Sequence, residues 1–307
     1  MLGLAHLRNV WGQTRQNGLC SSGGALRKVL LENTSLKLSR LGFGTSRLFN
    51  VASPQLRQRL LASAYDHGMT HFDTAPLYGF GVAERELKSV LATHPDATVA
   101  TKVGLYPPGG GDQHDFSVFF RKVAGRLVPI FSKAVVDWSV DRARKSLTGS
   151  LRRLGRSRID LYLLHEPEAH LLAADEWLSW LESERDRVAA FGIATYAAKF
   201  PASLTGGHPL ARIVQCSDSI ANAEADALIR AGVPLHITFG YITSAKRDPK
   251  ADAEAALAAA LRRNSKGCIL VSTTKEERIR RFAELVEKYD EGADSPSIDS
   301  PAQSERS

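Results

Sequence analysis

The sequence has no long hydrophobic runs: none of its segments approaches the roughly 18 consecutive apolar residues that a membrane span requires. Its three cysteines, Cys20, Cys216 and Cys268, show neither a CxxC spacing nor a disulfide framework. This pattern predicts reduced thiols in a reducing compartment. The histidines likewise lack the spacing of a metal site. We therefore expect a cytoplasmic protein with no membrane partner and no bound metal.

Acidic residues are absent from positions 1–31, although four basic residues occur there. This composition resembles in part an organelle transit peptide, and a disordered start is the alternative. We expect residues 1–24 to be an extension outside the folded domain, and residues 25–289 to form that domain. Positions 290–307 are rich in Ser, Asp, Pro and Glu, which predicts a disordered tail.

The net charge of +7 admits a nucleic-acid partner, because basic proteins bind phosphate backbones. The densest basic stretch, Arg142–Arg158, carries seven Lys and Arg residues, most of them at helical spacing. A solvated helix face explains this stretch better than a nucleic-acid interface. We expect a small-molecule partner and no nucleic acid.

Short apolar runs alternate with amphipathic stretches through the middle of the chain. Alternating strands and helices favour parallel pairing with right-handed crossovers, and eight such units favour a closed (β/α)8 TIM barrel in a single domain. The eight runs are Leu41–Thr45, Thr70–Asp73, Thr98–Val103, Ile159–His165, Val188–Ala194, Arg212–Gln215, Pro234–Phe239 and Gly267–Ser272. Between them, helical patterns cover Pro54–His67, Ala83–Ala92, Ser139–Leu154, Ala223–Ala231, Ala251–Arg263 and Lys275–Tyr289.

The alternative fold is an open doubly wound sheet, which places a glycine-rich fingerprint directly after its first strand. The nearest candidate, Gly42-Phe43-Gly44, lacks the third glycine and is not followed at once by a helix. The gap after the third run is about twice the length of the others. Its excess, Leu105–Val136, is predicted to be a rim loop of the kind that sets substrate selectivity in such barrels.

Four polar residues follow or end three of the predicted strands. Asp73 ends one strand and Tyr78 follows it after a turn, while Lys102 and His165 end two others. Reduction of a carbonyl needs a proton donor, and a free tyrosine has a pKa of about 10. A neighbouring ammonium would lower that pKa, Asp73 would orient Lys102, and His165 would hydrogen-bond the carbonyl oxygen. We predict that these four residues form a catalytic tetrad.

These residues, together with their flanking segments, resemble the aldo-keto reductase superfamily. The resemblance covers roughly residues 25–282, and its motifs are Leu38–Thr45, His71–Gly79, Thr101–Gly104 and Ser146–His165. It implies an NAD(P)-dependent oxidoreductase whose tetrad falls on the same four residues. The long third gap and Val135–Ser139 look most like the D-threo-aldose (L-fucose, galactose) dehydrogenase branch. That branch oxidises an aldose to a lactone with the tyrosine as base.

The same resemblance implies a set of cofactor-binding residues. These residues are Gly44, Thr45, Thr195, Gln215, Phe239, Thr273, Thr274 and Arg278. The chain departs from the family pattern where Ala194 and Thr195 replace a Ser-Asn pair that holds the nicotinamide carboxamide. Ser272 stands where NADP-preferring relatives often have Lys, and Phe282 where an Asn or Asp often meets the adenine.

Two functions therefore remain open from the sequence. The first is an oxidoreductase that uses NADP or NAD on a carbonyl or sugar substrate. The second is a non-catalytic regulatory or scaffold relative with weakened cofactor binding, which the changes at Ala194, Thr195 and Phe282 keep in consideration.

Overall fold

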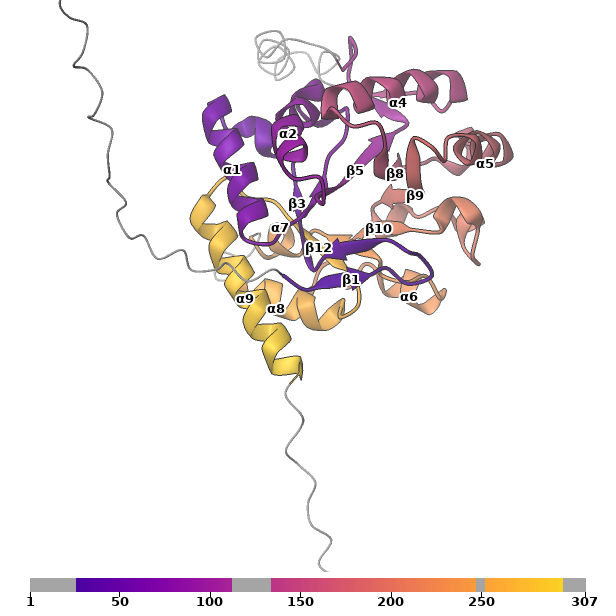
Figure 1. Ribbon diagram of the computed structural model, residues 1–307. Coiled ribbons are helices and arrows are strands. Elements are labelled where there is room, and N and C mark those ends of the chain that lie inside the picture. The colour runs from indigo at the N-terminus through magenta and orange to yellow at the C-terminus, as the bar shows by residue number, and fades with distance from the viewer. Residues whose placement is uncertain (1–25, 112–133, 247–251, 295–307) are drawn as a thin grey trace, which may run out of the picture.

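The computed structural model describes residues 26–111, 134–246 and 252–294 (Figure 1). Within them, eight strands close into a barrel in which every neighbouring pair is parallel. The (β/α)8 barrel is confirmed, and the open doubly wound sheet is excluded. In order around the barrel the strands are β3 (Leu41–Gly44), β4 (His71–Asp73), β5 (Thr98–Val103), β8 (Ile159–His165), β9 (Val188–Thr195), β10 (Val214–Ser217), β11 (Ile237–Phe239) and β12 (Cys268–Val271).

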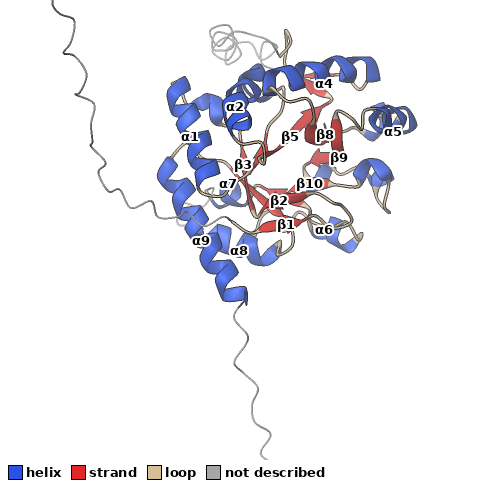
Figure 2. Cartoon of the chain, in the orientation of Figure 1, coloured by secondary structure: helices blue, strands red, loops and turns tan. Residues whose placement is uncertain are grey.

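Helices surround the strands (Figure 2). Local signals set several of their ends: Ser53 accepts a hydrogen bond from Leu56 N at the start of α1, and Gly155, at φ +65°, terminates α4. The described helices are α1 (Pro54–Asp66), α2 (Val82–Thr93), α4 (Val140–Leu154), α5 (Ala174–Ser183), α6 (Asp226–Arg230), α7 (Tyr241–Ala245), α8 (Ala253–Arg263) and α9 (Glu276–Asp294). The helical pattern of α9 thus continues five residues into the expected tail, and positions 295–307 lie outside the described residues.

A short hairpin of β1 (Lys28–Leu30) and β2 (Lys37–Ser39) precedes the barrel. Its side chains Val29, Leu31 and Leu38 pack into the same apolar cluster as the inward-facing residues of the barrel strands. The hairpin therefore closes the end of the barrel opposite the carboxyl ends of the strands. Residues 1–25, which include the whole of the expected N-terminal extension, lie outside the described residues.

Alternation along the strands decides which side chains reach the barrel interior. Ala100 on β5 and Leu163 on β8 belong to the inner cluster, whereas Val99 and Leu164 pack outward against the helices. Because side chains alternate with period two, Lys102 and His165 project inward at the carboxyl ends of their strands. The barrel thereby places polar groups above an apolar floor.

The long third connection begins and ends in a small hairpin. β6 (Leu105–Tyr106) pairs antiparallel with β7 (Val135–Val136), and residues 112–133 of the predicted rim loop lie outside the described residues. Gly104, at φ +103°, lets the Trp138 ring pack directly on the backbone where this connection leaves β5. The base of the connection is therefore built into the core.

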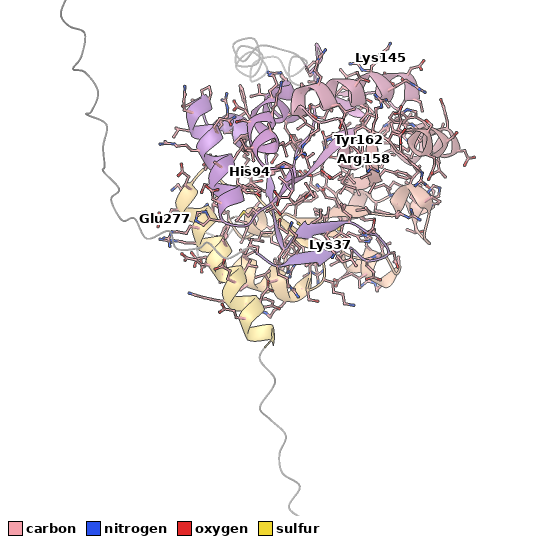
Figure 3. All side chains as sticks on the ribbon, viewed as in Figure 1. Lys37, His94, Lys145, Arg158, Tyr162 and Glu277 are labelled. Atoms are coloured by element: carbon pink, nitrogen blue, oxygen red, sulfur yellow. The ribbon has the colours of Figure 1, made fainter. Side chains whose placement is uncertain are left out.

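The basic stretch is only partly the solvated face that we expected. Lys145 points away from the body of the molecule (Figure 3), but Arg153 is buried and its Nε donates to Glu84 Oε2 at 2.6 Å. Arg156 donates to backbone carbonyls of the preceding α2–β5 connection. Arg153 and Arg156 thus connect segments that are distant in the sequence. The sequence pattern did not reveal this, because burial of a charge depends on contacts between distant segments.

Candidate active site

A cavity of about 540 Å³ opens at the carboxyl ends of the barrel strands. This is the end at which TIM barrels carry their active sites. Asp73, Tyr78, Lys102 and His165 all line the cavity. The structure thus brings the four predicted catalytic residues together, although Asp73 and His165 are far apart in the sequence.

Lys102 and Asp73 form an ion pair in the wall of this cavity. The ammonium donates to Asp73 Oδ1 at 2.7 Å and Oδ2 at 2.8 Å, and to the carbonyl oxygen of Thr74 at 2.9 Å. All three ammonium protons are therefore used, and both side chains are buried. Burial lowers the pKa of Lys102, and the Asp73 carboxylate acts against that shift.

Tyr78 begins a short irregular helical segment, Tyr78–Gly81, directly after the turn that follows β4. Gly79, Phe80 and Gly81 all have positive φ, and this tight path turns the chain so that Tyr78 faces back over the strand ends. The ring lies 4.9 Å from Lys102 Nζ and 6.0 Å, edge to face, from the His165 ring. The phenol is thus enclosed by the other members of the tetrad.

The pKa of Tyr78 is shifted in the direction opposite to the one predicted from the sequence. We expected Lys102 to lower the pKa of Tyr78, but the net shift is upward, because burial of the phenol dominates and the Asp73 carboxylate adds to it. The ion pair with Asp73 leaves little net positive charge next to Tyr78. The phenol of Tyr78 therefore stays protonated and neutral at neutral pH.

His165 is neutral as well. Burial, followed by the nearby Lys102 charge, lowers its pKa to about 3. Its Nδ1 is buried without a hydrogen-bond partner among the described residues. His71, two residues before Asp73 on β4, is also buried, and burial lowers its pKa to about 3. Its Nδ1 lies 2.9 Å from Thr98 Oγ1. A neutral His165 can orient a carbonyl or hydroxyl oxygen without adding charge.

Half of the predicted cofactor-binding residues line the same cavity: Gly44, Thr195, Gln215 and Phe239. Gln215 is buried and its Oε1 lacks a partner among the described residues, so an amide donor of a ligand would satisfy it. A Cβ at Gly44 would lie only 2.7 Å from Ser272 Oγ, so a side chain does not fit there. The cavity wall at this position is therefore formed by the Gly44 backbone. These features fit a nicotinamide carboxamide beside Gln215.

The other predicted cofactor residues do not line the cavity. Thr45 is buried and donates to the carbonyl oxygen of Asp73 at 3.0 Å, and Thr273 accepts from Lys275 N at 3.1 Å. Thr274 and Arg278 lie beyond them at the start of α9. Phe282, where relatives often have a polar residue, is packed in the apolar core between barrel and helices.

A group of basic side chains stands at one side of the cavity mouth. Burial and the positive charges of Arg278, Arg47 and Lys275 lower the pKa of Lys246, so these three cations lie within electrostatic range of the Lys246 ammonium. Arg47 also lines the cavity. We call Arg47, Lys246, Lys275 and Arg278 the basic cluster. Of its members, only Arg278 was predicted from the sequence to bind the cofactor; Arg47 and Lys246 come near it only in the folded chain.

The opposite side of the mouth carries cavity residues that the sequence argument passed over, Glu166 and Tyr196. Glu166 directly follows His165, and that position beside a predicted catalytic strand end was the one available signal. Within the described residues, no group of three or more His, Cys, Asp and Glu side chains is placed to hold a metal ion. Helices long and apolar enough to cross a membrane are also absent from the described ranges.

A closed parallel barrel with an ion pair, a tyrosine and a histidine at its carboxyl rim defines an enzyme-like class of protein. The Aldo/keto reductase family model matches residues 40–215. The chain belongs to the aldo/keto reductase family.

Individual relatives agree with this assignment. D-threo-aldose 1-dehydrogenase of a Pseudomonas species is 33% identical over 148 residues, which cover 44% of this chain and 42% of the relative. L-galactose dehydrogenase of Arabidopsis thaliana is 32% identical over 145 residues, covering 45% of this chain and 37% of the relative. The chain thus matches less than half the length of these curated relatives.

Solved structures share the fold. An aldo-keto reductase from Bacillus halodurans in its holo form superposes with a TM-score of 0.67 at 20% identity, covering 85% of this chain and 91% of that one. An aldo-keto reductase from Klebsiella pneumoniae in complex with NADPH superposes with a TM-score of 0.59 at 17% identity, covering 85% and 90%. At these identities the likeness is one of fold alone.

Proposed function

We propose that this protein is an NAD(P)-dependent oxidoreductase that interconverts a carbonyl and an alcohol, or an aldose and its lactone. The observation that carries the proposal is a buried, neutral Tyr78 enclosed with His165 and the Lys102–Asp73 ion pair in one cavity at the barrel rim. The relatives named for D-threo-aldose and L-galactose oxidation support it.

In this mechanism the chain moves one proton. During reduction, Tyr78 donates its phenolic proton to the oxygen of the substrate, while His165 hydrogen-bonds that oxygen and holds it against the phenol. Lys102, held by Asp73, lies beside the ring and stabilises the phenolate that forms. In the oxidative direction Tyr78 accepts the proton from the hydroxyl group. The nicotinamide, when bound, supplies or accepts the hydride.

The residues that would hold the cofactor divide between the cavity and its mouth. Gln215 and Thr195 would bind the carboxamide, with Phe239 packing against the ring, and the basic cluster would bind phosphate. Lys and Arg side chains are the usual phosphate ligands of proteins. Four of them at one side of the mouth favour NADP, which carries one phosphate more than NAD.

The test is titration of the purified protein with NADPH and with NADH, followed by nicotinamide fluorescence. We expect NADPH to bind more tightly, and a panel of aldehydes and aldoses then to be turned over with it. Absence of binding of both nucleotides at millimolar concentration would refute the proposal. It would favour the non-catalytic scaffold, because Ala194 and the buried Phe282 would then have removed contacts that the cofactor needs.

A further inference from the structure

Glu166 has a backbone conformation that is unusual for a residue other than glycine. Its φ is +50°, in the left-handed region that non-glycine residues seldom adopt, and its N–H donates to the carbonyl oxygen of Ala194 at 2.7 Å. Such conformations persist where the surrounding structure holds them, and they cluster at ligand-binding sites. Here the pairing of β8 with β9 places the Glu166 carboxylate in the wall of the active-site cavity.

The carboxylate is held by a neighbouring cation. Lys199 Nζ lies 3.2 Å from Glu166 Oε2 and 5.4 Å from the centroid of the Tyr196 ring. Lys199 belongs to the short helical segment Ala197–Lys199 that follows β9, so the three side chains form one group at the ends of two adjacent strands. We call Glu166, Tyr196 and Lys199 the rim triad.

The position of the rim triad relative to the tetrad sets what it can contact. Glu166 and Tyr196 line the cavity that contains Tyr78, and the Glu166 carboxylate adds to the upward pKa shift that burial and Asp73 produce at Tyr78. Glu166 also lines a second hollow of about 350 Å³, so it stands where the active-site cavity continues outward. A substrate whose carbonyl or hydroxyl oxygen reaches Tyr78 would extend its remaining atoms past the rim triad.

The chemistry of the rim triad suits one class of ligand. A carboxylate offers two acceptor oxygens, the ammonium offers donors, and the Tyr196 ring, 47% exposed and set edge to face against Phe239, offers apolar surface. Hydroxyl groups donate to carboxylates in strong, charge-assisted hydrogen bonds. A sugar presents hydroxyl groups beside C–H faces, and so matches all three side chains at once. The charges of Glu166 and Lys199 offset each other, which favours an uncharged ligand.

We propose that Glu166, Tyr196 and Lys199 form a subsite for the hydroxyl groups of an uncharged polyhydroxylated substrate, an aldose, with Glu166 as the main specificity-determining residue. This inference rests on the proposed oxidoreductase function for its substrate class. The basic cluster belongs to segments that follow β3, β11 and β12, whereas the rim triad follows β8 and β9, so the phosphates of a cofactor and the hydroxyl groups of the sugar would occupy opposite sides.

The first measurement is binding of D-galactose to the cofactor-free protein by titration calorimetry, compared between wild type, Glu166→Gln and Tyr196→Leu. Loss of a hydrogen bond to a charged group corresponds to about a tenfold to hundredfold weaker affinity, which we expect for Glu166→Gln. Glu166→Gly suits the left-handed backbone, so it deletes the side chain without adding strain. Glu284→Gln is the control, because that exposed carboxylate also pairs with a cation, Arg280, but lines neither of the two hollows.

The second measurement is kinetic. The ratio of kcat/KM for galactose oxidation to kcat/KM for butanal reduction should fall about tenfold or more in Glu166→Gln, mainly through KM for galactose, because butanal has no hydroxyl groups to lose. Glu284→Gln should keep the wild-type ratio.

The outcomes separate the two proposals. Glu166-dependent galactose binding without turnover of either substrate would overturn the oxidoreductase and leave the subsite standing. Turnover of butanal with a galactose affinity that is undetectable, or equal in wild type and Glu166→Gln, would overturn the subsite and leave the oxidoreductase standing.

Discussion

The Lys102 ammonium donates to both carboxylate oxygens of Asp73, at 2.7 and 2.8 Å, in the wall of the active-site cavity. Their side chains are only 1% and 5% exposed. Each charge therefore depends on the other, because an unpaired charge in so buried a place is costly. This dependence makes the pair a structural element as well as part of the proposed catalytic tetrad.

Lys102→Met should destabilise the protein by about 3–5 kcal/mol, since it leaves the Asp73 carboxylate buried without its cation. Urea denaturation measures that loss. The double variant Asp73→Asn/Lys102→Met should regain part of it, whereas additive losses would contradict the coupling.

Lys102→Met should also abolish most turnover, and the pH profile of any remaining activity should move upward, because the phenolate of Tyr78 loses its neighbouring cation. An unchanged profile would show that Lys102 does not tune Tyr78.

Tyr78→Phe should reduce turnover by about 10² to 10⁴-fold, the usual contribution of a positioned proton donor. NADPH binding should stay close to that of wild type, because the change removes only one hydroxyl group. Stopped-flow turnover and fluorescence titration measure the two effects. Tyr65→Phe on α1 is the control, since that hydroxyl group donates to Asp96 at the protein surface. Wild-type turnover in Tyr78→Phe would mean that another group supplies the proton.

Stability should fall as the pH falls from about 6.5 toward 3. Burial lowers the pKa of His71 and of His165 to about 3 in the folded chain, whereas an unfolded histidine titrates near its ordinary value of about 6.5. Between these values the unfolded chain binds protons that the folded chain does not, so the free energy of unfolding decreases with falling pH and is fully retained above 6.5. Denaturation at pH 7.5, 6.5 and 5.5 measures the slope. His71→Asn should reduce it by at most about 1.4 kcal/mol per pH unit, the contribution of one proton. A stability that stayed constant over this range would contradict the buried, neutral state of both rings.

Gly104→Ala should be strongly destabilising. A Cβ at this position would lie 2.1 Å from the Trp138 ring, and the backbone φ of +103° is unfavourable for alanine. Displacement of the ring adds to the strain, and we expect a loss of several kcal/mol, above the roughly 1 kcal/mol cost of the backbone alone. Gly232→Ala separates the two terms, because Gly232 has φ +74° with open space around its Cβ. Equal effects in thermal denaturation would rule out the contact with Trp138 as the cause.

Arg278→Ala should weaken NADPH binding about tenfold, the loss of one charge-assisted hydrogen bond to phosphate, and NADH binding by less. The reason is the place of Arg278 in the basic cluster. Arg280→Ala is the control on the same helix, because Arg280 is exposed and pairs with Glu284. Equal weakening of both nucleotides would place Arg278 away from the additional phosphate of NADP.

Strand and helix positions in the barrel were largely predictable, because apolar periodicity is a local property. The run Ile159–His165 coincides with β8, and the helical pattern from Pro54 ends one residue beyond α1. The hairpin of β1 and β2 was not among the predicted strands. The helical patterns named from the sequence did not include α5 or α7.

The tetrad could be predicted because each residue stands at or just after a strand end, and parallel strands bring such ends to one rim. Its electrostatics could not. The upward pKa shift of Tyr78 comes from burial, and burial depends on all the segments that enclose the cavity. The basic cluster combines residues from the β3–α1 connection, the end of α7 and the start of α9, which are adjacent only after the barrel closes.

The sequence by itself determined the alternation of strands and helices, the family, and the order in which Asp73, Tyr78, Lys102 and His165 meet the rim. These features depend on side-chain type and spacing along the chain. The tertiary structure alone decided which charges are buried and paired, that Gln215 Oε1 is buried without a partner among the described residues, and that Glu166, Tyr196 and Lys199 form one group. Those properties depend on distances between segments far apart in the sequence, and only the closed barrel sets such distances.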